Sequence, residues 1–311
     1  MTHYGALRIV GICLALAVSS SACGVGEKAP LTGVATPMDS PAQSESPSST
    51  DPTSPPSDKD FDPKNFTRST EVTNPYFPMN PGAQFLWKGH AIDDGGRVSR
   101  AIEFTVTDMT KTIDGVRTVV ARDRDITEGE VEEVELTFYA QDDFGTVWYF
   151  GEYSEEYDDK RIVKSPLWLA GLREATPGIM MPAQPRTRTP DYAEGWGGKS
   201  VHWNDRGKVR AVGVNDCGPT GCYTDVTVID EFNPDEPGQH QLKYYAPGVG
   251  GIRTGWDGKN EVEREELVLV SRKNLDERGL ADVRQSVQDE EKRAIQRSPG
   301  TYAMTAPMEK A

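Results

Sequence analysis

Apolar and polar residues alternate with a period of two through most of the chain between residues 61 and 273. Ile102, Phe104 and Val106, for example, alternate with the polar residues between them. The segment VELTFYAQ, residues 134–141, repeats this alternation. A period of two is typical of half-buried β-strands, so this region is predicted to be built from strands.

Short turn sequences separate the predicted strands. The segments TIDG (112–115) and DDFG (142–145) carry the Asp and Gly residues that favour tight hairpin turns. Later strands are predicted at 223–232, 240–247 and 265–272. Closely spaced strands with short turns form a meander, and such a sheet must hide its edges by curling or closing. We therefore predict an all-β domain over residues 61–273, a strongly curved antiparallel meander sheet or incomplete β-barrel, with residues 166–209 forming long loops over one end.

The pattern changes after residue 273 to that of a C-terminal α-helix, predicted over residues 274–297. Leu280, Val283, Val287 and Ala294 recur at helical spacing, and Asn274 or Asp276 can cap the first turn. Because this apolar stripe is thin, we expect the helix to be loosely docked or largely solvated. Residues 298–311 are predicted to be a frayed tail.

The first 22 residues have the features of a bacterial export signal. Arg8 supplies a positive charge, and residues 9–18 form an apolar run that is too short to span a bilayer. Ser21 and Ala22 stand directly before Cys23, an arrangement that resembles a bacterial lipobox. The resemblance implies a diacylglycerol-modified Cys23 at the mature N-terminus, anchored to the outer face of the plasma membrane. Ordinary secretion, with cleavage near Ala22, is the alternative.

Residues 23–60 are predicted to be a disordered stalk behind the lipidated cysteine. Between Pro37 and Asp58, 15 of 22 residues are Pro, Ser or Thr. Such a segment cannot bury enough apolar surface to offset the entropy lost on ordering.

The chain is strongly acidic, with 34 Lys and Arg against 49 Asp and Glu, and a formal net charge of −15. This balance argues against nucleic-acid binding, which needs clustered basic residues, and against lying flat on anionic lipid. The lipid anchor is therefore the predicted membrane contact.

Two cysteines remain in the predicted β-domain, Cys217 and Cys222, within the segment CGPTGC. Their spacing across a Gly- and Pro-rich turn brings the two Cβ atoms within disulfide distance. Zinc-motif partners are missing around them, so we predict a structural disulfide.

Five segments, between residues 74 and 250, carry a resemblance to a known group of proteins. They are NPYFPMNPG (74–82), IDGVRTVVARD (113–123), YAQDDFGTVWYFGE (139–152), PGIMMPA (177–183) and KYYAPGVG (243–250). Together they resemble secreted or lipid-anchored, β-rich bacterial proteins, mostly actinobacterial, that have no assigned activity. The resemblance implies an exported β-domain and supplies no catalytic residue. The segment CGPTGC and the C-terminal helix do not match this group.

Residues 139–161 combine seven aromatic residues with seven carboxylates. We interpret them mainly as a hairpin, with Trp148 and Phe150 on the strand face opposite Tyr149. The acidic side chains are weak candidates for a Ca²⁺ site, because they lack the spacing of a calcium-binding loop. These candidates are Glu152, Glu155, Glu156, Asp158 and Asp159.

The irregular segment 191–208 contains four candidate ligand-binding residues. They are Tyr192, Trp196, His202 and Trp203. Exposed aromatic side chains on Gly-rich loops would suit a cell-wall glycan or peptide. The alternative, which we favour, is that the tryptophans plug the open end of the sheet.

The sequence contains no catalytic motif that names a reaction. His90, His202 and His240 are far apart in sequence, and no nucleophile-elbow or zinc-binding motif accompanies them. We therefore predict a non-enzymatic, lipid-anchored envelope protein with a binding role and no cofactor. The alternatives are a secreted hydrolase built from scattered histidines and carboxylates, and an accessory subunit of a membrane complex that docks through its C-terminal helix.

Overall fold

The computed structural model describes residues 60–93, 96–199, 201, 203–259 and 264–311. The predicted signal peptide, Cys23 and nearly all of the predicted stalk lie outside the described residues. The elements are, in chain order, η1 (Pro63–Asn65), β1 (Ala83–Asp93), β2 (Gly96–Ile113), β3 (Val116–Thr127), β4 (Glu130–Gln141), β5 (Val147–Asp158), β6 (Arg161–Lys164), β7 (Leu167–Leu169), β8 (Thr176–Met181), β9 (Tyr192–Ala193), β10 (Gly195–Trp196), β11 (Arg206–Gly218), β12 (Gly221–Phe232), β13 (His240–Ala246), β14 (Gly250–Asp257), β15 (Glu266–Asn274), α1 (Glu277–Arg297), η2 (Tyr302–Met304) and β16 (Glu309–Lys310).

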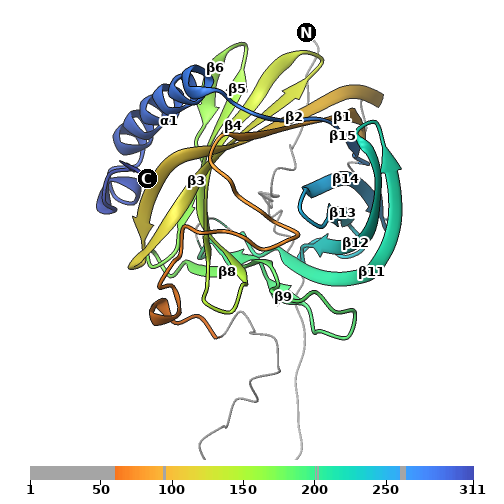
Figure 1. The fold of residues 1–311 in the computed structure, drawn as a ribbon. Coiled ribbons are helices and arrows are strands. Elements are labelled where there is room, and N and C mark those ends of the chain that lie inside the picture. Colours follow the sequence, from red (N-terminus) through yellow and green to blue (C-terminus); the bar gives the residue numbers. More distant parts are fainter. Residues whose placement is uncertain (1–59, 94–95, 200, 202, 260–263) are drawn as a thin grey trace, which may run out of the picture. The chain divides into compact units, whose positions relative to one another are not determined.

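The strands form one antiparallel sheet that curves until it is nearly closed (Figure 1). The strand order is β10-β8-β5-β4-β3-β2-β1-β15-β14-β13-β12-β11-β9, with β6 and β7 paired to β5 and β16 paired to β2. Most neighbours in this order are consecutive in sequence, as expected for a meander. The predicted fold class, a curved antiparallel sheet or incomplete barrel with one C-terminal helix, is confirmed.

Asp-Gly and Glu-Gly turns connect the long hairpins. Asp114 and Gly115 join β2 to β3 with φ of 48° and 78°. Glu128 and Gly129 join β3 to β4 with φ of 50° and 88°. Two successive residues with positive φ give the turn twist that matches paired antiparallel strands, which explains the tight connections.

Gly151 bends β5 without ending it. Its φ is 124°, and a Cβ at this position would lie 2.2 Å from the carbonyl oxygen of Trp168. The pairing of β5 with β4 shifts register between Thr137 and Tyr139, opposite this glycine. The strand then continues to Asp158. A bulge of this kind increases the local curvature of the sheet.

Residues 166–209, predicted as long loops, instead contribute four short strands that bring the two ends of the sheet together. Strand β10 pairs with β8, and β9 pairs with β11. Glu194 is the single residue between β9 and β10, so it stands where the two ends of the sheet meet. The backbone around it packs tightly, because a Cβ on Gly178 would lie 2.2 Å from the amide nitrogen of Gly195.

The sheet separates two hydrophobic cores. The inner core fills much of the barrel; its larger members include Phe85, Tyr139, Tyr149, Trp168, Trp203 and Tyr245. The outer core lies on the other face of the same strands; its larger members include Leu136, Phe138, Trp148, Phe150, Tyr153 and Tyr302. Trp148 and Phe150 thus lie on the face opposite Tyr149, as the alternation predicts.

Helix α1 covers the outer face of the sheet beside β2 to β5 (Figure 1). Two apolar residues of the helix, Val287 and Ala294, are fully buried on the side that faces the sheet. Asp276 caps the N-terminus of the helix by accepting a hydrogen bond from the Gly279 amide. Ion pairs with the sheet add to this thin apolar contact. They are Lys111–Glu291, Arg122–Glu290, Arg284–Asp108 and Arg293–Glu155. The helix is therefore docked firmly, not loosely as its sequence suggested.

The segment after the helix is packed, and the prediction of a frayed tail at 298–311 is wrong. Tyr302 is fully buried in the outer core, and Met308 is 8% exposed. Glu309 and Lys310 then pair with Thr110 and Met109 of β2. The tail covers apolar surface that the helix alone leaves open.

Candidate functional site

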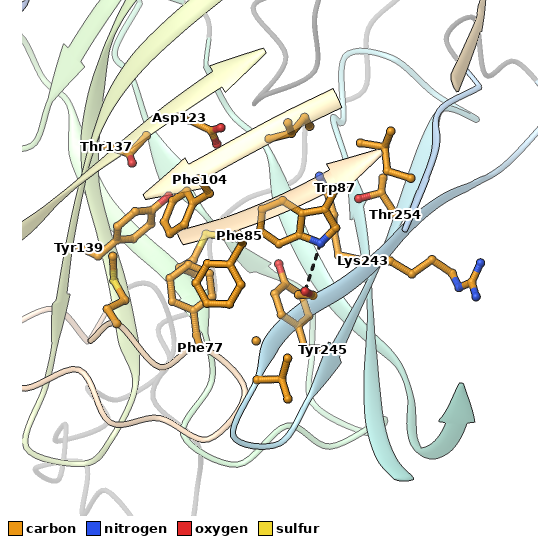
Figure 2. Close-up of a pocket in the computed structure, with 18 of the residues that line it drawn as sticks. Phe77, Phe85, Trp87, Phe104, Asp123, Thr137, Tyr139, Lys243, Tyr245 and Thr254 are labelled. Atoms are coloured by element: carbon orange, nitrogen blue, oxygen red, sulfur yellow. Dashed lines mark hydrogen bonds between the residues drawn. The ribbon is translucent and has the colours of Figure 1, made fainter. Parts of the chain in front are cut away.

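A cavity of about 160 Å³ lies inside the curved sheet. Six aromatic side chains line one part of it, as Figure 2 shows: Phe77, Phe85, Trp87, Phe104, Tyr139 and Tyr245. Phe85 and Trp87 are stacked, with ring centroids 5.7 Å apart and an interplanar angle of 17°. The Trp87 indole Nε1 donates a hydrogen bond to the Gly251 carbonyl oxygen at 3.1 Å, which fixes this ring. The aromatic part is therefore rigid.

Polar and ionisable side chains line the rest of the cavity. They are Asp123, Glu135, Thr137, Glu194, Glu231, Lys243, Arg253 and Thr254. Lys243 approaches Glu231, with Nζ and Oε2 3.9 Å apart. The guanidinium of Arg253 is already bound by Asp216, with Nε–Oδ2 at 2.8 Å and Nη2–Oδ1 at 3.0 Å. Four carboxyl groups thus line the cavity together with the Lys243 ammonium and the Arg253 guanidinium, and the guanidinium is paired with Asp216.

The pleat of β4 explains how carboxylates come to line the interior. Leu136 and Phe138 point to the outer core, so Glu135, Thr137 and Tyr139 point into the barrel. The polar face of this strand is therefore its inner face. The sequence shows the alternation of β4 but does not show which face turns inward.

Burial keeps these carboxyl groups protonated to unusually high pH. It raises the pKa of Asp123 to about 7, against the partial opposition of the Arg124 amide and Lys243. It also raises the pKa values of Glu135 and Glu194 well above the ordinary value, where neighbouring carboxylates act in the same direction. Glu231 shifts in the same direction for the same reason. Below these raised pKa values, bound protons neutralise the carboxyl groups.

Lys243 behaves differently from an isolated buried lysine. Burial alone would lower its pKa, but the surrounding carboxylates Glu231, Glu265 and Glu194 outweigh burial and raise it. Besides the Arg253 guanidinium, which Asp216 already binds, the cavity lining therefore holds the positive charge of Lys243.

Glu194 has an unsatisfied hydrogen-bond acceptor. The residue is 4% exposed and lines the cavity, and its Oε1 has no hydrogen-bond partner among the residues that the structure describes. The side chain packs against Gly207, where a Cβ would lie 2.8 Å from this oxygen. A buried carboxyl oxygen without a donor is costly, so a ligand that supplied a donor to this oxygen would stabilise the side chain.

The four candidate ligand-binding residues of segment 191–208 differ in how far the structure buries them. Trp203 is fully buried and stacks on Trp168, with ring centroids 4.7 Å apart. Tyr192 is also buried, and Trp196 is half-buried in β10. His202 lies outside the described residues. Trp203 and Tyr192 belong to the closed end of the sheet and do not form an exposed binding platform.

The five calcium candidates do not converge. Glu152 faces the barrel interior, where it accepts a hydrogen bond from the Tyr149 hydroxyl at 2.6 Å. Glu155 faces the helix and binds Arg293. Glu156 pairs with Lys164 at 2.9 Å, and Asp158 and Asp159 are exposed at the end of β5. Within the described part of the chain, no group of three or more His, Cys, Asp or Glu side chains is placed to hold a metal ion.

Cys217 and Cys222 form a disulfide, with the sulfur atoms 2.14 Å apart. They face each other across the β11–β12 hairpin. Arg253 donates a hydrogen bond to the Cys217 carbonyl oxygen at 3.1 Å. The disulfide thus closes a hairpin tip rather than linking distant strands.

The two histidines that the structure describes, His90 and His240, lie away from the cavity. Of the described residues that line it, none is a histidine. His90 lies beside Arg97 and Glu266, whereas His240 contacts Asp230 through Nδ1 at 2.7 Å.

The apolar stripe of helix α1, which was the predicted docking surface of an accessory subunit, is covered in part, because Val287 is fully buried against the protein's own sheet.

The five segments that carry the sequence resemblance all border this cavity. Each supplies at least one lining residue: Phe77, Asp123, Tyr139, Met180 and Lys243. The sequence does not show that these five segments lie around one cavity, because this becomes visible only when the sheet closes.

No protein-family model matches the sequence, and no curated protein matches it. Two solved structures are similar to 64% of this chain. One is a candidate exported protein with a YmcC-like fold from Bacteroides fragilis NCTC 9343, matched over 99% of its chain with 14% identity and a TM-score of 0.38. The other is a candidate lipoprotein from Parabacteroides distasonis ATCC 8503, matched over 98% of its chain with 14% identity and a TM-score of 0.37. Likeness at this level does not define a function.

The described residues include one long helix, α1, and neither it nor any other described helix is long and apolar enough to cross a membrane.

Proposed function

We propose that this protein is a lipid-anchored, extracytoplasmic binding protein that takes a small molecule with an aromatic or apolar part into the cavity of its β-domain. One observation carries this proposal: a cavity of about 160 Å³ with six aromatic rings in its lining. An engineered apolar cavity of about 150 Å³ is large enough to bind benzene, so a ligand with one ring fits this space.

The location rests on the N-terminal sequence. The apolar run before Ser21-Ala22-Cys23 supports export and lipidation, and the Pro- and Ser-rich segment after it would hold the β-domain away from the bilayer. Two acyl chains on one cysteine satisfy the two-signal requirement for stable anchoring.

Cell fractionation of two cysteine variants tests the anchor. Cys23→Ser is expected to move the protein from the membrane pellet to the soluble fraction, and intact mass should show the loss of the lipid. Cys13→Ser, inside the signal, is the control and is expected to leave the protein in the pellet. Membrane retention of the Cys23→Ser protein contradicts the anchor.

Ligand-observed NMR tests the cavity, with benzyl alcohol as probe and the exported Cys23→Ser chain as the soluble protein. Val249 lines the cavity, so Val249→Trp is expected to fill it and abolish binding. Val212 is 45% exposed on β11 and does not line the cavity, so Val212→Trp is the matched control. Equal binding to both variants would place the ligand elsewhere.

A further inference from the structure

The charge of the cavity lining constrains the chemistry of its ligand. Asp123, Glu135, Glu194 and Glu231 approach from β3, β4, the β9–β10 link and β12, and Lys243 is the one lysine among them. Grouping carboxylates in a poorly solvated space is unfavourable unless protons or cations compensate them. A cationic ligand can supply this compensation, because a nearby positive charge favours the ionised form of a carboxyl group.

The unsatisfied oxygen of Glu194 narrows the choice of cation. Within the described part of the chain no donor reaches its Oε1, and the residue is only 4% exposed. A donor on the ligand, such as an ammonium N–H, would satisfy it, whereas a quaternary ammonium has no N–H to give. A charge-assisted hydrogen bond to a carboxylate is also stronger than a neutral one.

The aromatic lining determines the rest of the ligand. Phe77, Phe85 and Phe104 present only hydrocarbon surface, and the Trp87 N–H is already used by Gly251. This part of the cavity suits an apolar or aromatic group, and ring faces also attract a nearby cation. Figure 2 shows these rings gathered together, with Asp123 and Thr137 beyond Phe104 and Tyr139.

We propose that the cavity selects a small organic amine, a primary or secondary ammonium group joined to an apolar or aromatic body. The ammonium lies against Glu194, Glu231 and Asp123, and the body lies against the aromatic rings. This inference rests on the proposed function of the cavity as a ligand site and adds the chemical class of the ligand.

Three probes of similar shape and different charge test the inference at neutral pH: benzylamine, benzyl alcohol and benzoate. Titration of the Cys23→Ser chain is expected to show benzylamine binding at least about tenfold more tightly than benzyl alcohol, and benzoate most weakly. Benzyltrimethylammonium, which keeps the charge without an N–H, is expected to bind more weakly than benzylamine.

Two carboxamide variants locate the ammonium. Glu194→Gln and Glu231→Gln are expected to weaken benzylamine binding about tenfold and to leave benzyl alcohol binding unchanged. Glu266→Gln is the matched control, because the Glu266 side chain is 59% exposed and does not line the cavity. Thermal melting of each variant reports whether it is folded.

The outcomes separate this inference from the proposed function. Equal binding of benzylamine and benzyl alcohol would overturn the inference and leave the cavity as a binding site for apolar molecules. Tightest binding of benzoate would also overturn it, with Lys243 as the ligand contact. Displacement of benzylamine by CaCl2 would overturn the inference, because it would indicate that the carboxyl groups bind a metal ion and not an amine. Failure of all three probes to bind would overturn both the inference and the proposed function.

Discussion

Arg293 of α1 binds both carboxylate oxygens of Glu155 on β5, at 2.7 and 2.8 Å. The Glu155 side chain is fully buried, and the hydroxyls of Tyr153 and Tyr157 each donate a hydrogen bond to it at 2.8 Å. Burial alone would raise the pKa of Glu155, but these hydrogen bonds and the arginine outweigh burial and lower it. The ionised pair therefore fastens the helix to the sheet.

Removing the arginine should destabilise the protein substantially. Arg293→Ala leaves the buried Glu155 carboxylate without its cation, which is expected to cost about 3 kcal/mol in the free energy of unfolding. Lys292, the next residue, pairs with Asp289 on the exposed side of the helix. Lys292→Ala is therefore the matched control and should change stability by less than about 0.5 kcal/mol. Equal urea midpoints for the two variants would contradict this role of Arg293.

The sequence predicted this helix but not how it is docked. Leu280, Val283, Val287 and Ala294 form too thin a stripe to hold it, and charged helix residues read naturally as solvent-facing. Their partners lie on strands 138 to 180 residues earlier in the chain. Pairs at such separations depend on the tertiary fold, which local periodicity does not encode.

The packed tail gives a second prediction about stability. Tyr302 is fully buried between Phe138 and Tyr153, with ring centroids 6.5 and 5.7 Å away. Tyr302→Ala is expected to cost about 3 kcal/mol through lost burial and the cavity left behind. Met304, in the same short helix, is 69% exposed, so Met304→Ala should be nearly neutral. Similar melting temperatures for both variants would contradict the packing of Tyr302 and would indicate a frayed tail.

The cavity shows a further limit of sequence pattern. The sequence shows the alternation of apolar and polar residues on β2 and β4 and the Asp-Gly turns, and together these features predict a curved meander. An amphipathic strand with Glu135 and Leu136 on opposite faces suggests that the glutamate faces solvent. Here the outer face is covered by α1 and the tail, so Leu136 packs outside and Glu135 lines the interior. Deciding between the two faces requires knowing what covers the sheet.

The sequence predicted a curled or closing sheet but not which strands close it, because these strands have only two to six residues and pair over long distances. Closure also depends on the close approach of Gly178 to residues 193–195. A Cβ at Gly178 would lie within 2.5 Å of three backbone atoms there. Short strands carry too few residues to show a period.

Gly178→Ala should therefore open or strain the closure. Backbone atoms cannot move aside as a flexible side chain can, and we expect a loss of at least about 2 kcal/mol in the free energy of unfolding. Gly218→Ala is the control, because a Cβ at Gly218 meets nothing within 4 Å and neither glycine has positive φ. A Gly178→Ala protein as stable as the control in urea unfolding would contradict the tight closure.

The interior carboxyl groups predict an unusual dependence of stability on pH. Burial raises the pKa of Asp123 and Glu133 to about 7 and that of Glu152 to about 8. In the unfolded chain such groups ionise near pH 4, so between about pH 4 and 8 the folded protein holds more protons. Its free energy of unfolding should therefore fall as pH rises through this window, by up to about 1.4 kcal/mol per pH unit for each retained proton. Glu155, whose pKa is lowered, acts in the opposite direction only at more acidic pH.

Glu152→Gln tests the origin of this slope. The Glu152 carboxyl group is faced by Tyr149, Glu133, Asp205 and Trp168, and the amide keeps its shape but cannot ionise. We expect the variant to match the wild type near pH 5, to be more stable than the wild type at pH 8, and to show a shallower slope between them. Glu71→Gln, at a side chain that is 61% exposed, should leave the slope unchanged. Urea unfolding at pH 5, 6, 7 and 8 measures all three proteins. A wild type that gains stability toward pH 8, or a Glu152→Gln slope equal to that of the wild type, would show that these carboxyl groups are ionised in the folded protein.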